Sequence, residues 1–271
     1  MLKKRIIFSL LYASGKFMLS RNFRLQQVGN YEWLSRNYNF FETATAIDEL
    51  IVINVERDSR PTAEFLRHLQ LLNDFCFVPI TAGGGIRGFC DAKEILSNGA
   101  DKVLVNTIAA TNPEELKRIS ETFGRQSIVL GVDLVTSHDQ TIPVVNYGRE
   151  VPSGFSNVQD HLSHLNMLPF GEWYINSVDR DGTGLGFDSE LLDLVPTDSH
   201  PLILAGGASK PEHFCKLFED SRVSALATAH LLNFVNDGLH RVRARLLDEG
   251  HDLPRWNPED HRKLRNSVNN V

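Results

Sequence analysis

The sequence predicts one (β/α)8 TIM barrel built from two pseudo-symmetric halves, on three observations. The 271 residues have a globular composition, 42% hydrophobic and 23% charged, which excludes a disordered, fibrous or disulfide-stapled chain. Short apolar runs rich in Ile, Val and Leu alternate with stretches of helical periodicity, the pattern of a parallel sheet covered on its outside. Motifs also recur at a spacing of 122 to 123 residues. Four βα units, duplicated once to give eight, favour a closed barrel over an open sheet.

Each predicted strand is a continuous apolar run, as expected of strands buried on both faces. The runs are residues 5–11, 50–55, 77–81, 102–106, 127–133, 173–178, 201–205 and 223–228. The predicted helices are residues 32–45, 61–73, 89–98, 113–123, 157–168, 188–194, 210–219 and 236–249. Pro61, Pro113 and Pro211 stand where a first helical turn needs no N–H donor. We therefore place a single barrel at residues 1–251 and a polar tail at residues 252–271.

The internal repeat pairs loops from the two halves of the chain. Ala82-Gly83-Gly84-Gly85 lies 123 residues before Ala205-Gly206-Gly207-Ala208, and Ile53-Asn54 lies 122 residues before Ile175-Asn176. In a duplicated barrel, corresponding loops lie on opposite sides of one mouth. The two halves should therefore contribute to a single site.

Composition also limits the classes of partner and ligand that the chain is expected to bind. The formal net charge is −6 with Lys and Arg scattered, which gives no electrostatic reason to expect nucleic acid or an anionic membrane. Cys76, Cys90 and Cys215 form no CxxC pair, so reduced thiols in the cytoplasm are expected. No apolar stretch approaches the ~20 residues of a membrane span. The His residues show no metal-ligand spacing, and we expect neither metal nor cofactor.

Two glycine-rich loops are candidate phosphate sites. Gly84 and Gly85 follow the third predicted strand, and Gly206 and Gly207 follow the seventh. Glycines let backbone N–H groups approach an anion, and a following helix adds its dipole. Further donors come from the ends of the neighbouring strands, at Asn106, Thr107, Thr228 and Ala229. Two such sites across one mouth predict a ligand phosphorylated at both ends, with tight turns that bind nothing as the alternative.

Asp133 is the candidate general acid or base. It ends the fifth predicted strand, at the mouth where barrel enzymes carry their chemistry, and apolar surroundings would raise its pKa. Its symmetry mate, Leu10 or Leu11, can transfer no proton. The segment after the sixth strand offers further groups for hydroxyls, phosphate or acid/base work, namely Asp179, Asp181 and Gly182. A self-satisfied turn is the alternative interpretation of that segment.

Four charged residues mark the opposite end of the predicted barrel. Arg5 opens the first strand, Glu49 precedes the second, Lys102 opens the fourth and Glu172 precedes the sixth. Alternating charges there could form a salt-bridged ring that seals the floor. A floor made of ion pairs could also open. The sequence is therefore compatible with either a structural or a gating role for these four residues.

Several motifs occur in the order of one known family. They are Lys4-Arg5-Ile6-Ile7, Gly83-Gly84-Gly85-Ile86, Gly99-Ala100-Asp101-Lys102-Val103 with Asn106-Thr107, Phe123-Gly124-Arg125-Gln126, Asp133, Ser177-Val178-Asp179-Arg180-Asp181-Gly182-Thr183 and Gly206-Gly207-Ala208. Together they resemble the cyclase subunit of imidazole glycerol phosphate synthase, HisF. The resemblance covers residues 4 to about 235, nearly the whole predicted barrel.

The resemblance implies a heterodimer with a glutaminase (HisH-like) subunit, which docks on the N-terminal face around Asp101 and sends ammonia through the barrel. At the C-terminal face ammonia would react with a bisphosphorylated ribonucleotide, giving imidazole glycerol phosphate and an aminoimidazole carboxamide ribotide in histidine biosynthesis. The glycine loops would hold the two phosphates. Arg5, Glu49, Lys102 and Glu172 match the ammonia gate of the family.

Three positions depart from the family pattern. The first of two catalytic aspartates aligns with Leu11, a loop Lys aligns with Leu19, and an Asp ending the second strand aligns with Asn54. A branch from surface-polysaccharide gene clusters also has a Leu-Leu pair after its first strand and is linked to acetamidino groups on nucleotide sugars. The resemblance to that branch predicts a variant enzyme for acetamidino-sugar or lipopolysaccharide synthesis. The alternatives are a non-catalytic phosphate-binding barrel that activates a glutaminase, and a bisphosphate sugar isomerase.

Overall fold

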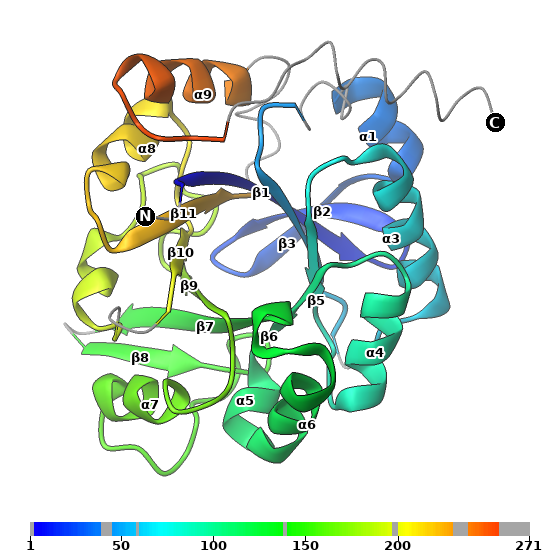
Figure 1. The fold of residues 1–271 in the computed structure, drawn as a ribbon, viewed down its shortest axis with the longest axis vertical. Coiled ribbons are helices and arrows are strands. Elements are labelled where there is room, and N and C mark those ends of the chain that lie inside the picture. Colours follow the sequence, from blue (N-terminus) through cyan, green and yellow to red (C-terminus); the bar gives the residue numbers. More distant parts are fainter. Residues whose placement is uncertain are drawn as a thin grey trace.

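The computed structural model describes residues 3–38, 45–57, 60–137, 140–196, 200–229 and 238–254. Within this part of the chain, parallel strands form a closed barrel in the order β11-β10-β9-β7-β6-β5-β4-β1, and pairing of β11 with β1 completes the ring. Helices surround the strands (Figure 1). The predicted (β/α)8 barrel is confirmed.

The barrel strands coincide with the predicted apolar runs. They are β1 (Arg5–Ala13), β4 (Glu49–Asn54), β5 (Ile80–Gly83), β6 (Lys102–Val105), β7 (Ile128–Ser137), β9 (Glu172–Ser177), β10 (Leu202–Ala205) and β11 (Val223–Thr228). The predicted run at 77–81 begins too early, because Phe77 is exposed and precedes the strand. β1 and β7 extend further than predicted, since each continues past the barrel into an antiparallel hairpin.

The helices cover the outside of the barrel. They are α1 (Tyr31–Tyr38), α3 (Ala63–Phe75), α4 (Phe89–Ser97), α5 (Thr107–Thr111), α6 (Pro113–Phe123), α7 (Val158–Leu165), α8 (Pro211–Phe218) and α9 (Gly238–Asp248), with 3-10 turns η1 (Arg125–Ser127) and η2 (Ser189–Asp193). Pro113 and Pro211 open their helices as predicted. Pro61 instead precedes the cap, where the Thr62 hydroxyl accepts from the Phe65 N–H.

Two predicted helices differ from the structure. The segment predicted as a helix at 188–194 forms the 3-10 turn η2, and its Leu191 and Leu192 still bury their side chains. Of the predicted helix at 32–45, α1 accounts for the first part, and residues 39–44 lie outside the described residues. α5 was not predicted; it is a short helix directly after β6.

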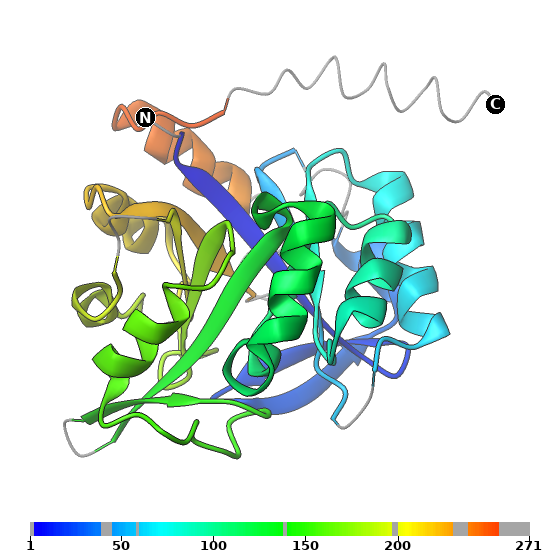
Figure 2. The ribbon, with the colours of Figure 1, turned by 60° about the horizontal axis from the view of Figure 1, so that its bottom comes forward.

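Two hairpins at one end of the barrel were also absent from the prediction. β2 (Lys16–Arg21) and β3 (Arg24–Gly29) extend β1, and β8 (Gln140–Val144) extends β7. The turn between β2 and β3 and the turn that follows β8 are alike: Asn22 and Phe23 have φ of 50° and 61°, and Asn146 and Tyr147 have φ of 50° and 62°. Figure 2 shows these strands at one end of the barrel, with the chain's N-terminus and α9 at the other.

The strands separate two apolar cores. The larger lies between the strands and the surrounding helices, with Phe8, Phe65 and Trp173 among its buried members. The smaller fills the barrel lumen, with Ile7, Ile51, Leu104, Val129, Tyr174, Ile203, Ala205, Ala225 and Ala227. Because strand side chains alternate between faces, every second residue of a barrel strand points into the lumen, and this periodicity positions the groups at its two ends.

The C-terminal helix is tied to the N-terminal end of the barrel by a buried ion pair. The Arg243 guanidinium on α9 donates to Asp48 Oδ1 at 2.8 Å and also to the Pro254 carbonyl. Leu253 is 1% exposed, so the chain remains packed at least to this point. The rest of the predicted polar tail, residues 255–271, lies outside the described residues. No helix in the described ranges is long and apolar enough to cross a membrane.

Candidate active site

A cavity of about 360 Å³ opens at the C-terminal ends of the barrel strands. Its lining brings together most of the residues that the sequence singled out for this end: Gly84, Gly85, Asn106, Thr107, Asp133, Asp181, Gly182, Gly206, Gly207, Thr228 and Ala229. Asp179 lies away from the lining, and its carboxylate accepts the Thr136 N–H at 2.6 Å. The two halves of the chain therefore contribute to one mouth.

Asp133 is held by two amides from neighbouring strands. Asn106 Nδ2 donates to one carboxylate oxygen at 2.7 Å, and Asn176 Nδ2 donates to the other at 2.9 Å. Burial raises the pKa of Asp133 to about 6; the Asp181 charge adds to the rise, and the two amides oppose it. A carboxyl group that titrates near neutral pH and is fixed in orientation is suited to accept and return a proton.

The mouth is asymmetric where the repeat would place a second carboxylate. Leu11 lines the cavity, whereas Leu10 points into the outer core, so Leu11 is the structural mate of Asp133. Leu19, Phe23, Leu25 and Ile53 line the cavity too. The mouth thus carries Asp133 on one side and a group of apolar side chains opposite it, and Arg57 and Arg87 also border the cavity.

The two glycine loops have the same backbone form. Gly84 and Gly85 have φ of 93° and 72°, and Gly206 and Gly207 have φ of 98° and 94°, so these loops match at an offset of 122 residues. A Cβ on Gly84 would lie 1.9 Å from the Asn54 carbonyl oxygen. Both the left-handed conformation and the close approach therefore require glycine.

One backbone N–H at or near the start of the helix beyond each loop is already bonded within the chain. The Phe89 N–H, at the start of α4, donates to Glu115 Oε2 at 2.6 Å, and the Ser209 N–H before α8 donates to His213 Nδ1 at 3.2 Å. The expected contribution of the helix N-terminus to an anion site is therefore limited at both loops. The glycine backbone and the strand ends that carry Asn106 and Thr228 are the groups that face the cavity.

The β2–β3 hairpin reaches across the mouth to the loop after β9. Asn22 Nδ2 donates to the carbonyls of Val178 and Asp179 at 2.9 Å, and the Ser20 hydroxyl and Phe23 N–H both donate to Asp181 Oδ2. A Cβ on Gly182 would lie 2.0 Å from the Ser20 carbonyl oxygen. Asp181 and Gly182 therefore also have a structural role in docking this hairpin.

The turn that follows β8, closed by the bridge between Val145 and Glu150, makes the symmetry-related crossing. Tyr147 Oη donates to the Glu56 carbonyl at 3.0 Å, and the Asn146 N–H donates to Thr107 Oγ1 at 3.2 Å. Phe23 and Tyr147 both line the cavity. Sequence reasoning missed both aromatic residues. Their signal was the Asn-aromatic pair repeated 124 residues apart, with Asn a residue that tolerates left-handed φ.

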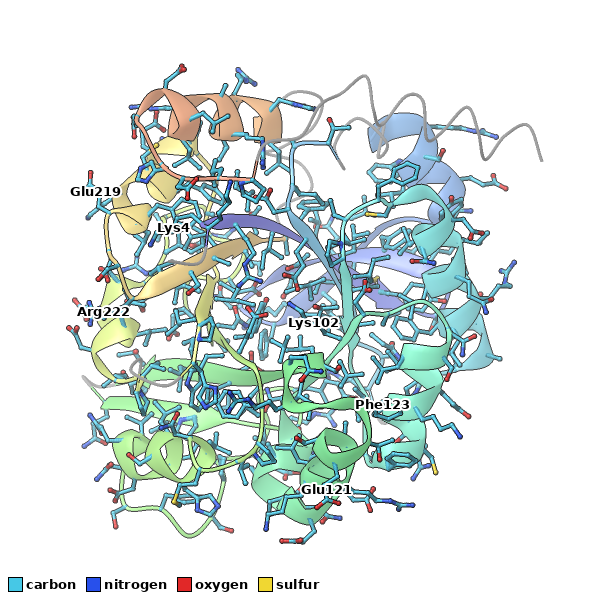
Figure 3. All side chains as sticks on the ribbon, in the orientation of Figure 1. Lys4, Lys102, Glu121, Phe123, Glu219 and Arg222 are labelled. Carbon is cyan, nitrogen blue, oxygen red and sulfur yellow. The ribbon has the colours of Figure 1, made fainter. Side chains whose placement is uncertain are left out.

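The four charges predicted for the barrel floor form a closed ring of ion pairs. Arg5 contacts Glu49 at 2.9 Å and also Glu172, while Lys102 contacts Glu172 at 2.6 Å and Glu49 at 3.3 Å. Glu49 also accepts the Thr81 hydroxyl at 2.6 Å. Lys102 lies inside the circle of strands, whereas Arg222 and Glu121 lie at the periphery (Figure 3).

The ring is nearly removed from solvent. The Glu49 side chain is 2% exposed, and those of Arg5 and Lys102 are 20% and 19% exposed. Burial acts to raise the pKa of Glu172, but the charges of Arg5 and Lys102 outweigh it and hold that pKa below its ordinary value. Arg5, whose pKa is raised by the neighbouring carboxylates, and Glu172 therefore remain charged at neutral pH. The ring separates the apolar lumen from the N-terminal face.

Fold and site together define a (β/α)8-barrel protein with a buried carboxyl group of raised pKa at its mouth and a salt-bridged floor. A family model described as histidine biosynthesis protein matches residues 34–235. A protein of Parasynechococcus marenigrum (strain WH8102), which carries the provisional name imidazole glycerol phosphate synthase subunit hisF2, is 46% identical over 259 residues, 94% of this chain and 95% of its own.

Relatives named imidazole glycerol phosphate synthase subunit HisF align over a similar length. The Chlorobium phaeovibrioides protein is 34% identical over 252 residues, 92% of this chain and 98% of its own. That of Thermotoga sp. (strain RQ2) is 33% identical over 231 residues, 84% and 89% of the two chains. The chain belongs to the HisF family, which confirms the family resemblance of its motifs.

Proposed function

We propose that this chain is the synthase subunit of a cytoplasmic glutamine amidotransferase. It receives ammonia from a glutaminase subunit at the barrel floor and uses it on a phosphorylated acceptor at the mouth. The names of its relatives support the family reaction. The observation that carries the proposal is the position of Asp133 at the mouth, at the opposite end of the lumen from the ring of Arg5, Glu49, Lys102 and Glu172.

The floor ring is suited to act as a gate. Arg5 and Lys102 each contact both carboxylates, so one cation can move aside while the other still compensates Glu49 and Glu172. Losing all compensation of a buried charge would be far more costly than such an exchange. The glutaminase would dock on the surrounding N-terminal face, where Asp101 lies and where its carboxylate also accepts the Ile80 N–H at 2.8 Å.

At the mouth, Asp133 would handle the protons of nitrogen addition. When neutral ammonia bonds to an electrophilic carbon, the new nitrogen carries a positive charge and must lose a proton. The Asp133 carboxylate, ionised at neutral pH because its pKa is about 6, accepts that proton and returns it to a departing oxygen. The Asn106 and Asn176 amides fix the carboxylate in place for both transfers.

The acceptor would be held by its phosphates. We assign one phosphate to Gly84 and Gly85 with Asn106 and Thr107, and the other to Gly206 and Gly207 with Thr228 and Ala229. These sets lie on opposite sides of the same cavity. Asp181 and Gly182, which border the cavity, would position the acceptor between them, and Asp179 would act through the loop that it stabilises.

Leu11 favours a variant of the family reaction. A cyclisation that needs two opposed acid/base groups would lose about 10²–10⁴-fold in rate without one of them. The apolar side of the mouth formed with Leu19 and Ile53 suits an acceptor with an uncharged face, such as an acylated amino sugar. We therefore assign the chain to acetamidino-sugar synthesis for lipopolysaccharide rather than to histidine synthesis; the name of the hisF2 relative supports a second-copy role.

The test combines the purified chain with a HisH-type glutaminase. The complex is supplied with glutamine and either the histidine-pathway bisphosphorylated ribonucleotide or an acetamido-sugar nucleotide. We expect glutamine hydrolysis only when both subunits are present, a product from the sugar nucleotide, and no rescue of a histidine auxotroph that lacks its cyclase. Rescue of that auxotroph would contradict the variant. Stimulated hydrolysis without any product, unchanged in Asp133→Asn, would instead identify a non-catalytic activator.

A further inference from the structure

The lumen between floor and mouth contains two hydroxyl groups in an otherwise apolar setting. Its buried lining is formed by Ile7, Ile51, Leu104, Val129, Ile203, Ala205, Ala225 and Ala227, together with Tyr174. Ser9 lies on β1 between Ile7 and Leu11 on the same face of the strand, and it lines the inner end of the mouth cavity with Tyr174. The proposed chemistry at the mouth uses neither residue.

Ser9 has an unsatisfied polar atom. Its side chain is 2% exposed, and Ser9 Oγ has no hydrogen-bond partner of normal distance and angle in the described structure. A hydroxyl buried in this way is unfavourable unless a small polar molecule completes its hydrogen bonds. The unsatisfied group faces a cavity that is open to the mouth.

Tyr174 directs a second hydroxyl toward the same place from across the barrel. It lies on β9, which is separated from β1 by β10 and β11, yet its phenol is close enough to Ser9 for that hydroxyl to affect its pKa. Burial is the largest effect and raises this pKa, so the phenol stays neutral and both donates and accepts. Gly131 stands beside Tyr174 on β7 and presents no side chain to the lumen.

We propose that Ser9 and Tyr174 form a relay site in the lumen that holds one neutral ammonia molecule between the floor ring and Asp133. Ammonia has one lone pair and three N–H groups, so one molecule can complete the hydrogen bonds of two neighbouring hydroxyls. The apolar lining disfavours the ammonium ion, because burial of an unpaired charge is costly. This inference rests on the proposed function, since it assigns a waypoint to the transfer of ammonia from floor to mouth.

The first test compares two nitrogen sources in the complex with its glutaminase. Tyr174→Phe and Ser9→Ala should each lower the glutamine-driven transfer rate about five-fold, the effect expected for one lost hydrogen bond. Transfer driven by ammonium chloride should stay within about two-fold, because external ammonia enters at the mouth and does not pass the relay site. Equal losses with both nitrogen sources, or no loss with either, would overturn the relay.

A matched control is Tyr12→Phe. Tyr12 is 1% exposed, and its hydroxyl accepts the Gly15 N–H and is hydrogen-bonded to His68 Nδ1, but it packs in the outer core. Its loss should lower stability without changing the ratio of glutamine-driven to ammonium-driven rates. If Tyr174→Phe behaves as this control does, Tyr174 is structural only.

A second test needs no acceptor and so remains decisive if the proposed function fails. In that case the wild-type complex transfers nitrogen from neither source. Crystals soaked in methylamine at alkaline pH should show elongated density in contact with Ser9 Oγ and Tyr174 Oη, absent from the Ser9→Ala/Tyr174→Phe double variant. Density at surface positions alone would mean an adventitious additive only. That result, or an empty lumen, would overturn the site.

Discussion

Replacing Asp133 by Asn tests the electrostatic basis of the mouth. In the folded chain the pKa of Asp133 is about 6, whereas the ordinary value for an aspartic acid is 3.8. Between these values the folded state binds more protons than the unfolded state, so this group makes folding less favourable as pH rises. The difference between the two pKa values corresponds to about 3 kcal/mol of destabilisation of the folded state. This destabilisation is fully present above the folded pKa.

The measurable quantity is the pH dependence of the stability difference between wild type and variant. From about pH 4.5 to about pH 7.5, wild type should lose about 2 kcal/mol relative to Asp133→Asn. The variant also turns one amide N–H toward a donor from Asn106 or Asn176, which costs about 1–3 kcal/mol. That cost does not vary with pH. It therefore shifts the stability difference between wild type and variant by a constant amount and leaves its pH dependence unchanged.

Urea denaturation followed by circular dichroism at several pH values gives the curve for each protein. On the same samples, the variant should lose about 10²–10⁴-fold in transfer rate while glutaminase stimulation persists. Wild-type transfer should increase as the pH rises through about 6 and Asp133 ionises. A stability difference that stays constant with pH would refute the raised pKa and the assignment of Asp133 as the base.

Three further predictions concern the framework. Gly84→Ala should lower the free energy of unfolding by more than about 3 kcal/mol. The control Gly154→Ala, with a similar φ of 90° but nothing within 4 Å of the added Cβ, should lower it by about 1–2 kcal/mol. Equal shifts of the two variants in thermal denaturation would contradict the close-approach argument. Arg243→Met should cost about 3–5 kcal/mol in urea denaturation by removing the cation that compensates the buried Asp48 carboxylate. A cost below 1 kcal/mol would be inconsistent with a buried ion pair. Glu172→Gln should lower the product formed per glutamine hydrolysed, and an unchanged ratio would argue against a gate.

The barrel strands were predictable because burial on both faces leaves continuous apolar runs such as Ile128–Val132. The hairpins were not, since β3 is mostly exposed and carries neither a continuous apolar run nor a strict alternation. The β2–β3 turn and the turn after β8 use Asn22-Phe23 and Asn146-Tyr147, which lack the Asn-Gly pair that usually marks a hairpin turn. Tertiary docking across the mouth stabilises these conformations in place of local sequence preference.

The site shows the same division between local and long-range information. The position of Asp133 at a strand end could be predicted, but its amide partners Asn106 and Asn176 come from strands 27 and 43 residues away. The choice between Leu10 and Leu11 required knowing which face of β1 points into the lumen. Asp179 looked equivalent to Asp181 in sequence, and the structure separates them: Asp179 accepts the Thr136 N–H away from the cavity, whereas Asp181 borders it.

Isotope tracing tests ammonia transfer through the barrel most directly. The chain and its glutaminase are given glutamine labelled with ¹⁵N at the side-chain amide, the acceptor and an excess of unlabelled ammonium in the medium. Passage from the floor ring to Asp133 predicts a product that keeps the amide label despite the external pool. A product labelled only in proportion to dilution by that pool would contradict transfer through the lumen, and a product without new nitrogen would contradict the proposed function itself.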